Sequence, residues 1–351
     1  MAASSSSSSS FSTIREEEEE EKDDYKRPYH IEHHYLNVYY DELYVIGCTS
    51  TRAYIITRCG RESYKAHYIQ LSDAVNNKPL QNGVFTSQWK QYTHANVNDY
   101  QSACVFDSLL CIVEKDGFHL LHEHAELSSR VSMEFDHVDT CCINNIYLIV
   151  VYQNRRIFVY NHSESRIICN VRIDDIIVDV SFLFVYDDTF IATTSTNDTR
   201  FYKITNDSVQ LSRRVCLLVA KDRINFTHEI RPCLFVTCSR SELSVVRADQ
   251  STGGIQMKVR SDFPSTIVDV IVMTGEKRNC IAVHDVEGCV QLLDWNLETF
   301  RTIGNHELFR PHNECKLPIH RIQRAYRSMT TFHDIFIILL PSADLCVIKF
   351  N

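Results

Sequence analysis

The chain has 351 residues, of which 44% are hydrophobic and 11% aromatic, so it is long enough to bury a large core and is not a low-complexity protein. Its net charge of −9 comes mostly from residues 1–24, where eight acidic residues stand against two basic ones. The remaining body is close to neutral and gives no overall basic footprint for nucleic acid. Its apolar runs are far shorter than the roughly 20 residues that a membrane-spanning helix needs.

Residues 1–24 form a Ser-rich and Glu-rich segment that cannot bury enough apolar surface to fold. We expect a disordered tail that improves solubility, with contact to a basic partner as the alternative. The segment lacks the basic and apolar regions of a signal peptide. The 14 cysteines are dispersed, and several lie in strand-like runs. We therefore expect free thiols in an intracellular protein, cytoplasmic or nuclear or both.

A strand-like apolar run followed by a polar turn and a second strand recurs along residues 25–351. The runs begin at residues 43, 109, 147, 190, 234, 280 and 336, so that successive starts are 66, 38, 43, 44, 46 and 56 residues apart. A period of 40 to 50 residues made only of strands is the pattern of a β-propeller. The sequence predicts an all-β fold, a single seven-bladed propeller in which no blade buries its own faces.

The unit at 178–215 shows one blade most clearly, because four strand-like segments follow one another with tight turns between them. The two wide spacings predict insertions near residues 72–98 and 304–327. The last unit stops after its third strand. We expect residues 25–33 to supply the missing outer strand, which would remove an exposed sheet edge.

Residues 283–295 read VHDVEGCVQLLDW, a strand, a turn with an acid and a Gly, and a second strand that ends at Trp295. This segment resembles the central hairpin of a WD40 repeat, and residues 194–202 and 114–118 are similar. The resemblance spans about residues 29–351, although no unit ends in a plain Trp-Asp pair. It implies a WD repeat β-propeller of the kind that acts as a non-catalytic scaffold for protein–protein interaction.

Histidines cluster at 30–34 and 119–124, and His312, Cys315 and His320 lie in the second insertion. None of these groups has the paired ligand spacing of a structural zinc site. Motifs for a nucleophile elbow, a phosphate-binding loop or a dinucleotide fold are also absent from the sequence. We therefore predict no catalytic residue, no cofactor and no metal, and we expect that the protein is not an enzyme.

The insertions carry the candidate partner-binding residues. The second has five basic residues in 306–327, namely Arg310, Lys316, Arg321, Arg324 and Arg327. A basic loop with aromatics can hold phosphate or RNA, can dock a protein, or can simply be a solvated loop. The first insertion supplies three aromatics, Phe85, Trp89 and Tyr92. These side chains either bind a partner or cover the blade beneath them.

Together these features predict a scaffold subunit of an intracellular multisubunit complex, with other proteins as its partners and no membrane association. One alternative is a non-catalytic subunit that contacts RNA through 306–327 and orients it for a partner enzyme. A less favoured alternative is an enzyme with its site in the axial channel. Steep salt dependence of binding would indicate the RNA alternative, whereas acids or a metal converging at one channel mouth would indicate the enzyme.

Overall fold

A computed structural model of the chain describes residues 29–36, 42–58, 64–76, 85–87, 89–92, 99–122, 129–183, 186–215, 224–239, 241–248, 255–275, 278–304, 329–332, 335–339 and 345–350. In these residues the backbone is almost all β-strand, and the helix is the short α2 (Leu71–Asn76). No helix in this part of the chain is long and apolar enough to cross a membrane. Residues 1–24 and the insertion at 306–327 lie outside it.

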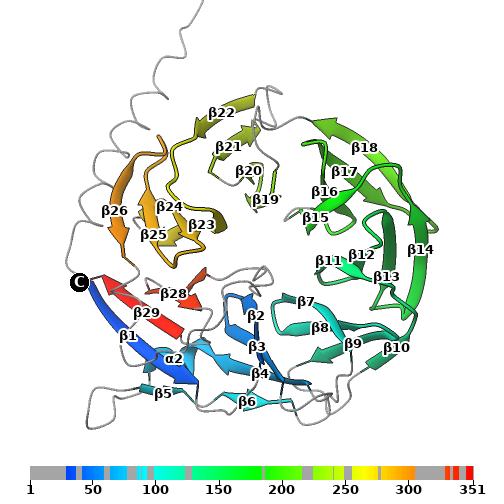
Figure 1. Ribbon diagram of the computed structural model, residues 1–351, viewed down its shortest axis with the longest axis horizontal. Helices are drawn as coiled ribbons and strands as arrows, with labels where there is room; N and C mark the ends of the chain where they lie inside the picture. The colour runs from blue at the N-terminus through cyan, green and yellow to red at the C-terminus, as the bar shows by residue number, and fades with distance from the viewer. Residues whose placement is uncertain are drawn as a thin grey trace, which may run out of the picture.

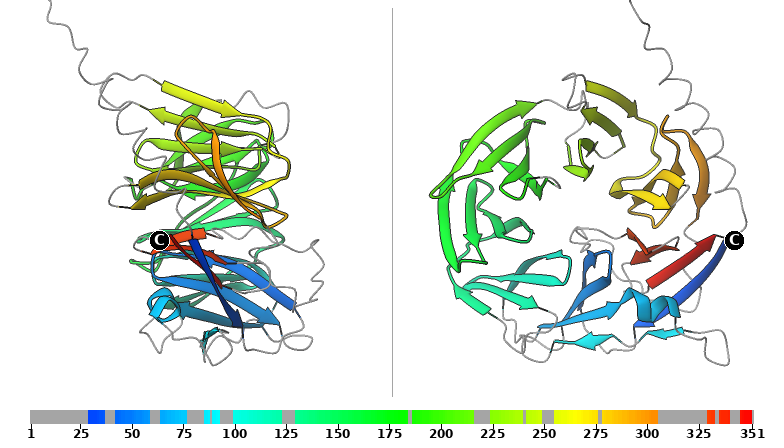
Figure 2. Two further views of the ribbon diagram at one scale, coloured as in Figure 1. Left: turned by 90° about the vertical axis from the view of Figure 1, so that its left-hand side faces the viewer. Right: turned by 180° about the vertical axis from the view of Figure 1, so that it is seen from behind.

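The described strands form seven separate sheets arranged around one axis, as Figure 1 shows. Six sheets have four strands and one has five. Seen from the side, the sheets make a thick disc, and the view from behind shows the same closed ring (Figure 2). The predicted seven-bladed all-β propeller is confirmed.

Each blade is built on a central antiparallel hairpin, and the seven hairpins match the seven predicted repeats. They are β2 (Glu42–Cys48) with β3 (Arg52–Arg58), β8 (Leu109–Glu114) with β9 (Gly117–His122), β12 (Tyr147–Tyr152) with β13 (Arg156–Asn161), β16 (Thr189–Thr194) with β17 (Thr199–Ile204), β20 (Leu234–Cys238) with β21 (Leu243–Ala248), β24 (Arg278–Asp285) with β25 (Val290–Leu293), and β28 (Ile335–Leu339) with β29 (Leu345–Phe350). We number the blades 1 to 7 in this order.

Inner and outer strands flank the hairpins. The inner strands are β7 (Tyr100–Phe106), β11 (Val138–Ile143), β15 (Ile177–Phe182), β19 (Phe226–Arg231), β23 (Ile267–Gly275) and β27 (Met329–Phe332). The outer strands are β4 (Tyr64–Gln70), β10 (Ser129–Ser132), β14 (Arg166–Arg172), β18 (Val209–Val215), β22 (Ile255–Arg260), β26 (Thr299–Ile303) and β1 (Tyr29–Leu36). Residues 37–41, which precede β2, lie outside the described part.

The first described strand closes the ring. β1 runs antiparallel to β29, with Tyr29 opposite Phe350 and His34 opposite Leu345. Ile31 on β1 packs against the apolar cluster between blades 6 and 7. The segment before residue 36 thus supplies the outer strand of blade 7, as the sequence predicts. Without it, the edge of β29 would lack a partner strand.

The core is divided among the blade interfaces. Seven apolar clusters of described residues fill the seven interfaces between neighbouring blades. Adjacent strand residues face opposite interfaces, so Cys141 belongs to the cluster shared by blades 2 and 3, and Cys142 to the one shared by blades 3 and 4. All eleven cysteines in the described residues are free, and nine are buried.

The interface between blades 4 and 5 differs from the others because its apolar cluster has only three buried residues, Ile191, Phe235 and Val246. Buried hydroxyl groups occupy the space instead. The Thr199 and Thr227 hydroxyls lie 3.2 Å apart across the interface, and the Ser181 hydroxyl donates to the Thr227 carbonyl at 3.2 Å. These hydrogen bonds satisfy polar groups that would otherwise destabilise the interface.

The described residues of the first insertion form secondary structure that the sequence does not predict. After β4 the chain forms α2, then β5 (Phe85–Ser87), which runs parallel to β1, and β6 (Lys90–Gln91), which pairs with β4. The insertion therefore extends the sheets of blades 7 and 1 on the outside of the ring (Figure 1). These strands are too short to produce a recognisable period in the sequence.

Candidate interaction surfaces

We call the end of the disc where the central hairpins turn the turn rim. It is formed by residues 49–51, 115–116, 153–155, 195–198, 239, 241–242 and 286–289, within the described part. Polar side chains set these turns. Asp285, for example, accepts backbone hydrogen bonds from Glu287 at 3.0 Å and Cys289 at 2.9 Å. Asn154 and Asn197 have φ values of 57° and 63°, a left-handed conformation that Asn tolerates better than most residues.

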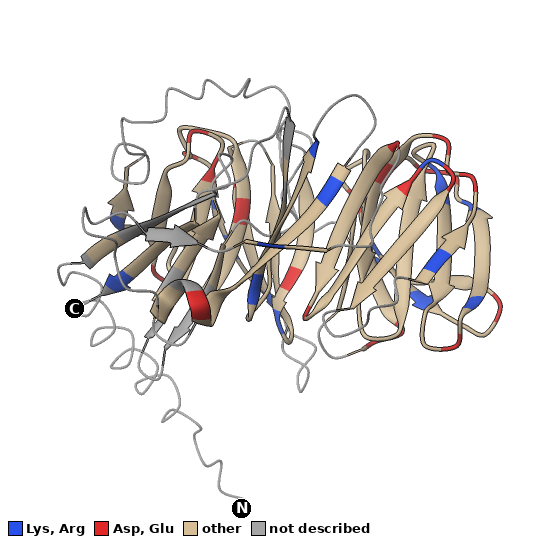
Figure 3. Cartoon of the chain, turned by 90° about the horizontal axis from the view of Figure 1, so that it is seen from below, with Lys and Arg blue, Asp and Glu red and all other residues tan. Residues whose placement is uncertain are grey.

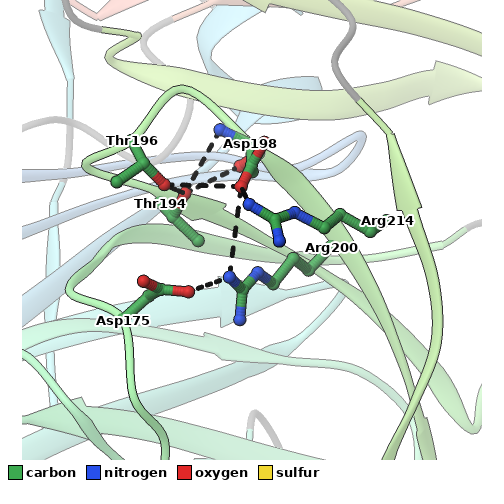
Figure 4. A network of polar contacts seen from close by, with 6 residues as sticks. All are labelled: Asp175, Thr194, Thr196, Asp198, Arg200 and Arg214. Atoms are coloured by element: carbon green, nitrogen blue, oxygen red, sulfur yellow. Dashed lines mark hydrogen bonds and ion pairs between the residues drawn. The ribbon is translucent and has the colours of Figure 1, made fainter.

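Blade 4 carries a network of charged and polar side chains on this rim (Figure 4). Arg214 on β18 pairs with Asp198 in the hairpin turn, and Arg200 on β17 pairs with Asp175 in the connection before β15. Arg200 also lies 4.0 Å from Asp198, and the backbone amide of Asp198 donates to the Thr194 hydroxyl at 3.2 Å. The network fixes a turn, a connection and an outer strand to one another and leaves Arg214 59% exposed.

On the inner strands, a carboxylate and an imidazole connect three neighbouring blades. The Asp179 carboxylate on β15 lies 2.7 Å from Nε2 of His228 on β19 and accepts from the Thr140 hydroxyl on β11 at 3.3 Å. Asp269 on β23 similarly accepts the backbone amide of Met329 on β27 at 3.0 Å. An Asp–His pair of this kind suits proton transfer, but here each member also connects its own blade to the next.

A second acid–histidine pair lies inside blade 2. Glu114, which is fully buried, lies 3.2 Å from Nε2 of His119, and Arg130 approaches its other oxygen at 3.5 Å. Arg130 in turn pairs with the exposed Asp116 at 2.7 Å. No group of three or more His, Cys, Asp or Glu within the described residues is arranged to hold a metal ion.

The aromatic residues of the first insertion pack onto the ring. Trp89 contacts the apolar cluster between blades 7 and 1, and Tyr92 contacts the one between blades 1 and 2. The Tyr92 ring lies 4.9 Å from Tyr68, whose face also receives the guanidinium of Arg52 at 4.7 Å. Burial raises the pKa of the Tyr92 phenol well above its usual range, and the nearby Arg52 opposes this shift. Covering the blade is thus one role of Trp89 and Tyr92.

The partner-binding role of these aromatics stays a prediction. The backbone of Phe85 lies on β5, and its side chain is outside the described part. Trp89 and Tyr92 are partly buried, and the indole nitrogen of Trp89 and the hydroxyl of Tyr92 are both buried.

The basic residues of the second insertion, Arg310, Lys316, Arg321, Arg324 and Arg327, lie outside the described residues. The ends of the insertion are placed by strand register. Ile303 lies opposite Val290, which follows the hairpin turn of blade 6, and Met329 lies opposite Ile338 near the end of β28. The described residues that flank the insertion therefore lie at the turn rim, and the role of the insertion in binding stays a prediction.

Charge is distributed over the ring with both signs interspersed, and many acidic residues lie at turns (Figure 3).

The polar residues of the inner strands were not predicted from the sequence, although a pattern was present. In four blades the inner strand begins with an apolar or aromatic residue, and a polar residue follows two positions later, just after a shift in the pairing register with the next strand. The polar residues are Ser102, Thr140, Asp179 and Asp269. An apolar–x–polar triplet repeated at the start of these four units could have revealed this position.

Comparison with known proteins defines the fold and no more. No protein-family model matches the chain, and no curated protein matches it. Among solved structures, the WD40 β-propeller domain of Doa1 is similar at a TM-score of 0.58 with 11% identity, covering 90% of this chain and 95% of that one. KlHsv2 with loop 6CD replaced by a Gly-Ser linker is similar at 0.56 with 11% identity, covering 86% and 90%. Taken with the seven closed blades, these similarities show that the chain has a WD40-like β-propeller fold.

Proposed function

We propose that the protein is a scaffold subunit that holds other proteins together in an intracellular complex, in the cytoplasm or the nucleus. The observation that carries this proposal is the closed ring itself. Seven blades closed by β1 form two rims and a circumference, and propellers of the WD40 kind generally bind other proteins through such surfaces.

The buried charged groups support a structural use of the chemistry-bearing residues. Asp179 and His228 have side chains only 11% and 17% exposed, and each contacts a neighbouring blade. Glu114 and His119 lie inside blade 2 with Arg130 beside them. A scaffold needs such groups to hold the blades in register, whereas a hydrolase needs them open to a substrate.

The test is affinity purification of the tagged full-length chain followed by mass spectrometry. A scaffold recovers a reproducible set of proteins at near-equal amounts, and the set survives high salt in part. Replacing Arg321 and Arg324 with Glu then shows whether the second insertion contributes. Loss of one partner with an unchanged melting temperature assigns the partner to this loop, because exposed substitutions usually change stability by less than about 0.5 kcal/mol.

RNA contact through residues 306–327 is the second candidate. It is favoured by five basic residues in one connection whose ends lie on the turn rim. RNA binding would fall steeply with salt concentration and would be lost in the same double variant. Recovery of proteins but no RNA from the purification would favour the scaffold over this alternative.

A further inference from the structure

The outer strands carry a charge bias that the whole chain does not have. Of the seven outer strands, β4 and β1 carry Lys65 and Glu32, and the other five, β10, β14, β18, β22 and β26, contain eight basic residues and no acidic one, although acidic residues outnumber basic ones 45 to 36 in the chain. The basic residues are Arg130, Arg166, Arg172, Arg213, Arg214, Lys258, Arg260 and Arg301. The circumference is therefore locally cationic on a nearly neutral body.

Acids in neighbouring turns neutralise several of these cations. Arg166 pairs with Glu164 at 3.2 Å, Arg260 with Asp262 at 2.6 Å, and Arg130 and Arg214 have carboxylate partners as well. Lys258 on β22 is different. Its ammonium donates to the carbonyl of Trp295 at 2.7 Å and to the side-chain oxygen of Asn296 at 2.8 Å, which are both neutral. Within the described residues no carboxylate pairs with Lys258.

β22 also differs from the other outer strands in the regularity of its exposed edge. It ends its sheet, so among the described strands one of its edges has no partner strand. It pairs with β21 through six consecutive residues without a register shift, whereas β14, β18 and β26 each contain one. β10 is regular but has only four residues. Since bulges and short length are the usual protections of a sheet edge, β22 presents the edge best suited to pair with another strand.

The two faces of β22 are chemically distinct. Met257 lies opposite Val246, so that it shares the face turned toward blade 4, as does Val259 two residues on. These side chains are 48% and 50% exposed. Lys258 lies on the other face and contacts blade 6. Aliphatic and cationic side chains thus alternate along a regular strand.

We propose that the free edge of β22 is a docking site for an extended segment of a partner protein in which acidic and aliphatic residues alternate. The proposal rests on the scaffold function. Residues directly opposite in paired strands project from the same face, so the aliphatic side chains of such a segment contact Met257 and Val259 while its carboxylates reach Lys258. Main-chain hydrogen bonds along the edge supply affinity, and the alternating side chains supply specificity.

Two other occupants fit the edge less well. A second copy paired antiparallel through β22 would place Lys258 and Arg260 of both copies on one face, where like charges repel. Single-stranded RNA would require aromatic side chains for base stacking, and β22 contains no aromatic residue. The charge and the alternation both favour an acidic, aliphatic peptide.

The experiment measures binding of fluorescent synthetic peptides to the full-length chain by anisotropy. A short peptide of alternating Glu and Leu should bind, and the same peptide with Ser in place of Leu should bind at least about tenfold more weakly. Two further versions carry N-methyl groups on one or the other set of alternate amides. One of them must lose binding, because only one set faces the strand edge.

The variant Lys258→Glu should no longer bind the Glu–Leu peptide and should instead bind a peptide of alternating Lys and Leu. Arg172→Glu on β14 makes the same charge change on another exposed outer-strand residue and should leave both affinities unchanged. The melting temperatures of both variants verify that they are folded.

Equal affinity for both N-methylated peptides, or unchanged Glu–Leu binding by Lys258→Glu, would overturn the proposal. So would displacement of the peptide by oligouridylate, or a concentration-dependent dimer that Lys258→Glu abolishes. Affinity purification separates this result from failure of the scaffold function. If partners remain bound to the Lys258→Glu variant, the scaffold function is retained and the β22 site is rejected. If the unmodified chain recovers no partners, the scaffold function itself is rejected.

Discussion

Two buried histidines should make the ring sensitive to mild acid. His67 is 2% exposed with its Nε2 atom 2.8 Å from the Thr57 hydroxyl, and His284 is 3% exposed on β24. Burial lowers the pKa of each imidazole from 6.5 to about 4, and the charge of Lys65 adds to the effect at His67. The folded state therefore holds both side chains neutral, while the unfolded state binds protons below about pH 6.5.

This difference in pKa between the folded and unfolded states sets the direction in which stability changes with pH. The stability contributed by neutral His67 and His284 is complete above about pH 6.5 and is lost as the pH falls toward 4. At pH 5 an unfolded imidazole is almost fully protonated and a folded one almost neutral, so that each histidine costs about 2 kcal/mol of unfolding free energy relative to pH 8. The two together should cost about 4 kcal/mol, a large share of the stability of a typical domain.

Urea unfolding at pH 8 and pH 5 measures this cost. The variant with His67→Gln and His284→Gln keeps polar side chains of similar size but cannot titrate, so its loss between the two pH values should be smaller than that of the unmodified chain by about 4 kcal/mol. His122→Gln, at an exposed position on β9, is the matched control and should behave as the unmodified chain does. The same pH dependence in the double variant and the unmodified chain would refute the reasoning.

Three further predictions concern the ring itself. Gly117→Ala should lower stability by about 1–3 kcal/mol in thermal unfolding, because φ is +156° and an added Cβ would lie 2.3 Å from the Val131 carbonyl oxygen; an unchanged melting temperature would contradict this. Deleting residues 25–35 should lower the melting temperature strongly and deleting 1–22 hardly at all, since only the first removes β1 from β29; equal losses would argue against closure. In native chain treated with iodoacetamide at pH 8, the partly exposed Cys233 and Cys289 should be alkylated before the nine buried cysteines of the described residues. Cys104, Cys142 and Cys238 should resist, because burial raises the pKa of their thiols well above the usual range; early modification of these three would contradict their burial.

The central hairpins could be predicted from the sequence because each combines a buried apolar strand, a turn of polar residues and a second strand. At 147–161, for example, the predicted strands coincide with β12 and β13. Closure by β1 could also be predicted, since the last unit lacks an outer strand. The inner strands are harder to recognise because a register shift and a polar residue, such as Asp179 on β15, interrupt their apolar pattern.

The candidate surfaces depend on features that a sequence does not display. Arg52 reads as an exposed charge, yet it is 1% exposed beneath Tyr68 because β6 and Tyr92 cover the end of blade 1. The edge of β22 becomes distinctive only when its regular register is compared with the shifted registers of β14 and β18. Both effects arise from contacts between segments distant in the chain, so local patterns alone could not predict them.

The scaffold function is tested most directly by simultaneous binding. Two partners recovered with the full-length chain are purified separately and mixed with it, and the mass of the resulting complex is measured by light scattering on a size-exclusion column. If the ring holds partners together, the complex contains one propeller with both partners, and each partner still binds when the other is saturating. Mutually exclusive binding, or release of both partners on addition of a small-molecule substrate that the protein converts, would contradict the account.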